Sequence, residues 1–345
     1  MRGVLMHPTR PLRAALFFLG SLAGASWAAG QGKSIPLPGG AGGIGLDDMG
    51  WAPSLSRIVV PAGRTGRIDL IDPAGGPMTD IGGFRVSAAG TTRGGGTTSA
   101  SEGAGLLFAT DRTAGDVVAV EEKTRKIVAR AKLAGGPDYV RWVEATHEVW
   151  VTEPEGERIE IFRLGSGFPP ALEHSGFVAV AGGPESLAID GARGRAYANL
   201  WKAETVAIDL KTRAIASRWK NGCGGARGLA LDPRRGFLFV ACTEGRVLSI
   251  DVENGKTLSS APAPNGIDII DYNPSLAHLY VPGAKDAQLA VVAVSKDGAL
   301  SALGRMPTAP RAHCVAAEPG GGIYVCDPAH GAVIALQDTF PGEKP

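Results

Sequence analysis

Short apolar runs alternate with turns along this chain, and the same unit recurs. One unit is an apolar strand, a turn built on Asp, Asn, Gly or Pro, and a second strand that ends in an aromatic residue beside a β-branched one. Four copies are PDYVRWVEATHEVWV, PESLAIDGARGRAYA, ARGLALDPRRGFLFV and GIDIIDYNPSLAHLYV, which begin at Pro137, Pro184, Ala226 and Gly266. The side chains alternate with a period of two, so the repeat predicts β-sheet and excludes a helical solenoid.

A third strand follows each unit, and it occurs seven times. Its versions are GRIDLID, GDVVAVE, ERIEIFRL, ETVAIDL, GRVLSIDV, QLAVVAVS and GAVIALQD, which begin at Gly66, Gly115, Glu157, Glu204, Gly245, Gln288 and Gly331. A fourth, more polar strand comes next in most copies, such as KIVARAKL from Lys126. Its pattern fits an outer edge strand with one side in water. Four short strands every ~40–45 residues predict an all-β, seven-bladed β-propeller with four-stranded antiparallel blades.

The last copy lacks its fourth strand, because only TFPGEKP follows VIALQD. The segment KSIPLPG, from Lys33, is a spare strand ahead of the first full copy. We therefore expect this N-terminal strand to complete the last blade and close the ring, which removes the sheet edges of an open array. The stretch GTTRGGGTTSASEGAG, from Gly90, is expected to be flexible because of its Gly, Thr and Ser content.

The first residues are typical of a secretory signal peptide. Three arginines accompany an apolar run over residues 14–25, which is too short to span a bilayer, and the small residues up to Ala28 fit a peptidase site. We expect residues 1–28 to be removed and residues 29–345 to form a single propeller domain, either periplasmic or secreted. No later stretch has the length and hydropathy of a membrane span.

Charge and composition limit the function further. Removal of the three N-terminal arginines takes the formal net charge from +1 to −2. This near-neutral balance excludes the basic surface expected of a nucleic-acid-binding protein and a polybasic membrane patch. Fifty glycines and 24 prolines fit a protein made of short strands and many turns.

The second strands carry residues by which the chain resembles the YVTN family of exported bacterial propellers. Where that family has its tetrapeptide, this chain reads WVTE, YANL, FVAC, YVPG and YVCD, which begin at Trp150, Tyr197, Phe239, Tyr280 and Tyr324. The opening IPLPG and the phrases GGPESLAID and GLALDPRRGFLFVAC are also similar to exported members. The resemblance covers residues 33–338 and implies the propeller fold. It implies no single function, because propellers include both binding proteins and enzymes.

Polar residues occupy the same position, just before the innermost strand, in successive blades. They are Asp138, Glu185, Arg227, Asp268 and His313, with Thr97 and Asp47 continuing the series backwards. Because the innermost strands line the central channel, we expect the five to ring one mouth and to bind a small molecule or a partner protein. The alternative is that polar residues gather there only because the mouth is wet.

Converging carboxylates also point to a second function. Glu185 and Asp268 are candidate ligands of a divalent metal ion. Together with Asn265 they resemble, in residue type, the Glu, Asn and Asp of metal-dependent lactone-hydrolysing propellers, but the flanking residues do not reproduce those motifs. The chain also has no complete catalytic motif. The leading hypothesis is therefore a non-catalytic binding protein, with a metal-dependent lactonase or related hydrolase as the alternative. An accessory role to redox enzymes fits the fold, but no cofactor-binding residue indicates it.

The four cysteines predict disulfides in an exported chain. A hairpin folded about the EPGGG turn makes Cys314 and Cys326 direct cross-strand partners. Cys223 and Cys242 bracket the equivalent hairpin of the fifth blade, with an offset of a few residues. A metal site made of His313 and the first pair is not favoured, because no CxxC or HxxxH spacing supports it.

Overall fold

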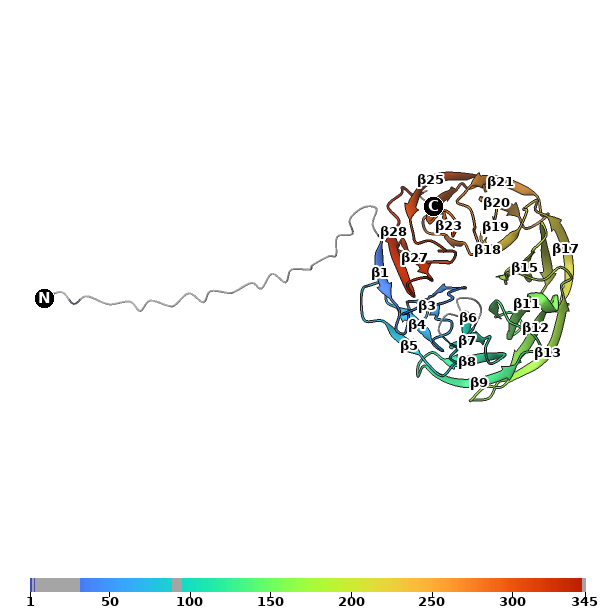
Figure 1. Ribbon diagram of the computed structural model, residues 1–345, viewed down its shortest axis with the longest axis horizontal. Coiled ribbons are helices and arrows are strands. Elements are labelled where there is room, and N and C mark those ends of the chain that lie inside the picture. Colours follow the sequence, from blue (N-terminus) through green and yellow to red (C-terminus); the bar gives the residue numbers. More distant parts are fainter. Residues whose placement is uncertain (2, 4–31, 89–94, 343–345) are drawn as a thin grey trace.

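The computed structural model describes residues 1, 3, 32–88 and 95–342. These residues form seven four-stranded antiparallel sheets, arranged as blades around a central axis (Figure 1). The predicted seven-bladed all-β propeller is confirmed. Helix within the described part of the chain amounts to one 3-10 turn, Pro154–Gly156, and none there could cross a bilayer. The predicted signal peptide falls almost wholly outside the described residues.

Each of blades 1 to 6 takes four consecutive strands, from the axis outward, in chain order. Blade 1 consists of β2 (Gly50–Ala52), β3 (Arg57–Pro61), β4 (Ile68–Ile71) and β5 (Thr79–Ile81). Blade 2 consists of β6 (Thr97–Gly103), β7 (Leu106–Asp111), β8 (Asp116–Glu121) and β9 (Lys126–Lys132). Blade 3 consists of β10 (Val140–Val143), β11 (Glu148–Glu153), β12 (Arg158–Leu164) and β13 (Leu172–Ala179). Blade 4 consists of β14 (Ala188–Asp190), β15 (Arg195–Leu200), β16 (Glu204–Asp209) and β17 (Ala214–Lys220). Blade 5 consists of β18 (Ala226–Asp232), β19 (Phe237–Cys242), β20 (Arg246–Asp251) and β21 (Thr257–Pro262). Blade 6 consists of β22 (Asp271–Asn273), β23 (His278–Gly283), β24 (Gln288–Val294) and β25 (Leu300–Pro307).

Blade 7 joins the two ends of the chain. Its inner strands are β26 (Val315–Ala317), β27 (Gly322–Asp327) and β28 (Ala332–Gln337), and its outer strand is the N-terminal β1 (Lys33–Pro36). β1 runs antiparallel to β28, with Lys33 opposite Ala335 and Pro36 opposite Ala332 (Figure 1). The predicted closure of the ring by this segment is therefore confirmed.

The burial pattern explains why these residues form blades. The second strands β7, β11, β19, β23 and β27 are buried at every position, because both faces of each sheet pack against neighbouring blades. The outer strand β17 instead alternates exposed and half-buried residues, as its polar pattern predicted. Large side chains fill the gaps between blades: Trp142 of blade 3 stacks on Phe108 of blade 2, with ring centroids 5.1 Å apart.

Residues 95–105 of the stretch from Gly90 lie within the described part of the chain. Its residues Thr97–Gly103 form strand β6, so the prediction of flexibility was wrong for them. Hydroxyl groups replace apolar packing there: the Thr98 and Thr110 hydroxyl oxygens lie 2.8 Å apart. A register shift between Thr97 and Ala100 accommodates the irregular sequence.

The closure of the ring can be tested with two truncated chains. A chain that begins at Leu37 lacks β1, and we expect it to be less stable by about 2–4 kcal/mol, because several ladder hydrogen bonds and the packing of Ile35 are lost. The free edge of β28 should also promote self-association. Urea unfolding and size-exclusion chromatography measure both effects. A chain that begins at Gly32 keeps β1 and is the control; equal unfolding midpoints for the two chains would contradict the role of β1.

Candidate ligand-binding site at the channel mouth

One cavity of ≈ 1030 Å³ opens at the end of the channel where the innermost strands begin. All five residues predicted to ring a mouth line it, together with Asp47: the set is Asp47, Asp138, Glu185, Arg227, Asp268 and His313. They come from six different blades. The structure therefore brings the predicted residues together, and their role in binding stays a prediction.

Backbone hydrogen bonds between adjacent blades hold these positions side by side. The Gly228 N–H donates to the Asp268 carbonyl at 2.8 Å, and the Ile269 N–H donates to the His313 carbonyl at 2.9 Å. The equivalent bond between blades 1 and 2 joins the Asp48 N–H to the Thr98 carbonyl at 3.0 Å. In blade 2 the cavity is accordingly lined by Thr98 and not by Thr97, because the irregular register of β6 shifts the position by one residue.

Arg112 is a cavity residue that the sequence analysis missed. It follows β7, in a loop that reaches the same mouth, and its Nη2 donates to Asp138 Oδ1 at 2.8 Å and lies 4.0 Å from Asp47 Oδ2. Its Nε also donates to the Pro137 carbonyl at 2.8 Å, which fixes the guanidinium group in place. The only signal in the sequence was its position after a second strand.

Glu185 and Arg227 form a second charged pair at the mouth. Arg227 Nε lies 3.4 Å from Glu185 Oε1. The indole N–H of Trp201 donates to the other carboxylate oxygen of Glu185, and the Arg227 guanidinium lies 6.0 Å from the centre of the Trp201 ring. Trp201 is 42% exposed, which is unusual for a large apolar side chain. Its place at the cavity rim was not predicted.

Burial, and then the charge of neighbouring carboxylates, raise the pKa of several carboxyl groups in this cavity. Burial, and then the charge of Asp138, raise the pKa of Glu185 to about 7, while the Trp201 hydrogen bond and Arg227 oppose the rise. Burial raises the pKa of Asp138 to about 6; Arg112 lowers it and the charge of Asp268 adds to the rise. Burial and the neighbouring Asp138 and Asp268 raise the pKa of Asp47 well above its ordinary value. Carboxyl groups of this cavity therefore take up protons at a higher pH than exposed carboxyl groups do.

A second cavity of ≈ 700 Å³ lies toward the far ends of the innermost strands. Asp48 and Arg141 contribute to its wall, and their two N–H···O bonds of 2.5 and 3.0 Å join blade 1 to blade 3. The Ser99 hydroxyl donates to Asp48 at 2.5 Å. Tyr139 lines both cavities, and the Arg141 guanidinium stacks 5.2 Å from its ring centre. Tyr139 is therefore part of the wall of both cavities.

The residues of the lactonase-like trio do not meet. The backbone N–H and side-chain amide of Asn265 both donate to Asp286 Oδ2, at 2.8 and 3.1 Å, and Asn265 does not line the cavity. Glu185 and Asp268 belong to no group of three His, Cys, Asp or Glu side chains, among the described residues, whose ligand atoms lie within 4.8 Å of one another. Metal binding by Glu185 and Asp268 therefore stays a prediction. Among the described residues no third His, Cys, Asp or Glu side chain completes a metal site with them.

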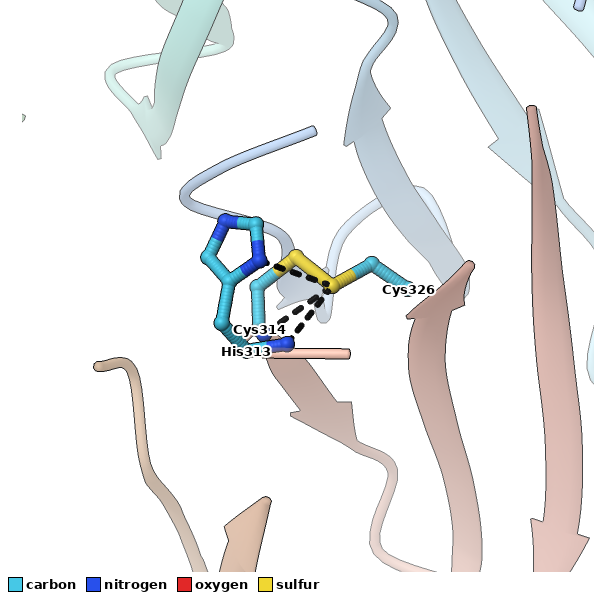
Figure 2. Close-up of side chains that lie close together, drawn as sticks. All are labelled: His313, Cys314 and Cys326. Atoms are coloured by element: carbon cyan, nitrogen blue, oxygen red, sulfur yellow. Dashed lines mark hydrogen bonds between the residues drawn. A yellow bond between two sulfur atoms is a disulfide. The ribbon is translucent and has the colours of Figure 1, made fainter. Parts of the chain in front are cut away.

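Both predicted cysteine pairs lie at disulfide distance. The Cα atoms are 5.5 Å apart for Cys314 and Cys326, and 5.2 Å apart for Cys223 and Cys242. Figure 2 shows that the first disulfide lies beside His313, whose Nδ1 is 4.0 Å from Cys326 Sγ and donates to the Arg311 carbonyl at 2.7 Å. Because the sulfurs are bonded to each other, this cluster has no thiolate to offer a metal. Two disulfides fit an oxidising compartment.

Comparisons with known proteins support the fold and nothing finer. No family model matches the sequence, and no curated protein matches it, so the YVTN family stays a predicted resemblance. A chain in the structure of hydrazine synthase from Kuenenia stuttgartiensis is similar, with a TM-score of 0.70 and 12% identity over 86% of this chain and 96% of that chain. A chain of the mitotic checkpoint complex is similar with a TM-score of 0.73 and 12% identity, over 95% of this chain and 99% of that chain.

The raised pKa of Glu185 predicts a pH dependence of stability. The folded state holds the Glu185 proton more tightly than the unfolded chain, so stability from this group is full below pH ~4.5 and falls as the pH rises to about 7. The Glu185→Gln variant does not ionise. Its free energy of unfolding, relative to wild type, should therefore rise by about 1–3 kcal/mol across this window.

Urea unfolding at pH 4.5 and pH 8 measures this difference. Glu253→Gln is the matched control, because Glu253 is an exposed carboxylate paired with Arg193 on the outer surface. It should follow the wild type at both pH values. A constant difference between Glu185→Gln and wild type would show that burial does not raise this pKa.

Proposed function

We propose that this chain is an exported, non-catalytic binding protein that holds a polar small molecule or a segment of a partner protein in the mouth cavity. One observation carries the proposal: charged side chains from six blades line a single cavity of ≈ 1030 Å³. Ligand sites in proteins are typically concave and of this size, with a few converging polar groups. The propeller fold itself is consistent with a binding or scaffold role.

The arrangement of the acidic residues favours binding over lactone hydrolysis. A raised carboxyl pKa by itself suits either a catalytic acid or a crowded binding site. However, metal-assisted hydrolysis needs several ligands around one ion, and the amide of Asn265 is held by Asp286 outside the cavity. The lactonase alternative therefore receives no support from the geometry.

Export to the periplasm or beyond the cell rests on two features. Residues 1–28 have the pattern of a signal peptide, and both cysteine pairs lie at disulfide distance. Disulfides form and persist in oxidising compartments, and they are rare where thiols are kept reduced.

Thermal unfolding against a panel of polar metabolites and envelope extracts tests the binding function. A ligand of the mouth cavity should raise the Tm of the wild type, because it binds the folded state alone. The effect should change in Arg227→Ala, which alters the charge of the cavity and frees Glu185 from its ion pair. Asp297→Asn, in an exposed turn after β24, is the control and should respond like the wild type.

Two results would contradict this proposal. One is turnover of a lactone or ester substrate by the purified protein at a rate typical of enzymes. The other is a stoichiometric divalent metal that is lost in both Glu185→Gln and Asp268→Asn, with a fall in the wild-type Tm on addition of chelator. Either would favour the metal-dependent hydrolase instead.

A further inference from the structure

Negative charge is in excess at the bottom of the mouth cavity. The carboxylates of Asp47, Asp138, Glu185 and Asp268 are close enough to affect one another's pKa values. Two guanidinium groups, Arg112 and Arg227, pair with three of these four carboxylates. Glu155 adds a fifth carboxylate to the cavity wall, and Lys285 and Arg311 add two cations, so the lining carries one net negative charge when every carboxylate is ionised and His313 is neutral. Other ionisable groups that line the cavity are Tyr139, Glu155, Lys285, Arg311 and His313.

The fourth carboxylate, Asp268, has no partner. Within the described part of the chain its side chain makes no hydrogen bond and no ion pair, although it is half-buried in the cavity wall. A carboxylate in such a position usually accepts two or more hydrogen bonds. Its four acceptor sites are therefore available to a donor that enters the cavity.

Tyr139 is a second, independent sign that a ligand binds in the mouth cavity. The residue as a whole is 5% exposed, and its hydroxyl makes no hydrogen bond among the described residues but is not shut off from the space that Tyr139 lines. Tyr139 lines the same cavity as Asp268, Asp138 and Asp47, and after burial the charges of these three residues are the main causes that raise its pKa. A hydroxyl and a carboxylate that line one cavity, both without a partner among the described residues, mark the place where a ligand group would sit.

We propose that the mouth cavity binds an organic cation, with a primary ammonium group held by the Asp268 carboxylate and the Tyr139 hydroxyl. An ammonium group has three N–H donors and one positive charge, which match the unpaired acceptors and the excess negative charge. The exposed Trp201 ring at the rim can cover the alkyl part of the same molecule. This inference rests on the proposed binding function, and it adds the chemical class of the ligand.

Three probes test the inference: hexylamine, 1-hexanol and hexanoate. They share a six-carbon chain and differ in the charge of the polar end group. Titration calorimetry at pH 8 should show hexylamine binding at least tenfold more tightly than the other two. Affinity for hexylamine should fall about tenfold from pH 8 to pH 5, because protons then compete with the cation for the carboxylates. Equal or tighter binding of 1-hexanol or hexanoate would overturn the inference.

Variants locate the ammonium group. Asp268→Asn should weaken hexylamine binding at least tenfold, and Tyr139→Phe about threefold, with Asp297→Asn unchanged. Circular dichroism and Tm confirm that each variant is folded, and Tyr139→Phe removes only one oxygen atom. Unchanged hexylamine affinity in both folded cavity variants would overturn the inference.

Two peptides distinguish the two possible sources of the ammonium group, a lysine side chain of a partner protein and a free amine. The peptides acetyl-Gly-Lys-Gly-amide and acetyl-Gly-norleucine-Gly-amide differ in the ammonium group. Preference for the lysine peptide over hexylamine indicates a protein partner, and the reverse indicates a free amine; both results support the inference. If another ligand binds the cavity and no ammonium probe does, the inference fails and the binding function stands. If no ligand of any charge binds, both fail.

Discussion

The antiparallel pairing of β1 with β28 is the interaction on which the rest of this structure depends. Each blade buries its two faces against neighbours, so an open array would leave an unpaired blade at each end. Closure gives every innermost strand a fixed neighbour, as the hydrogen bonds from Gly228 to Asp268 and from Ile269 to His313 show. Residues as distant in sequence as Asp47 and His313 thereby line the same cavity.

The same convergence determines the electrostatics of the mouth. No blade contributes more than a few charged groups, yet four blades together place the carboxylates of Asp47, Asp138, Glu185 and Asp268 in a partly dehydrated space. Their mutual repulsion and burial explain why the pKa of Glu185 reaches about 7 while an exposed carboxyl such as Asp209, held by Thr212 and Arg195, has a pKa of about 2. Arg112 and Arg227 offset part of this charge, and Asp268 has no ion-pair partner among the residues that the structure describes.

The two ends of the channel differ in how their polar groups are satisfied. Toward the far end, Asp48 is bound by Arg141 and Ser99, and Asp271 accepts hydrogen bonds from the backbone N–H groups of Tyr272 and Ala317. At the mouth, Asp268 and the Tyr139 hydroxyl have no such partners in the described part of the chain. Unsatisfied groups beside a cavity favour ligand binding, whereas satisfied ones favour a structural role. This contrast is one of the observations on which the proposed binding at the mouth rests.

Much of the architecture was determined by the sequence alone, because it is encoded locally. Period-two alternation and the repeat spacing predicted the blades, the missing fourth strand predicted the role of residues 33–36, and hairpin symmetry paired Cys314 with Cys326. The position before each innermost strand also identified Glu185 and Asp268 as residues of one cavity.

Only the tertiary structure decided the rest. It showed that Arg112 and Trp201 reach the mouth from loops between strands, that Thr98 replaces Thr97, and that Asn265 turns to Asp286. Those contacts join segments from different blades, and the strength of each charge depends on burial and on neighbours through space. A pattern along the chain specifies which residues form a strand, and it carries no information about which loops meet above the channel.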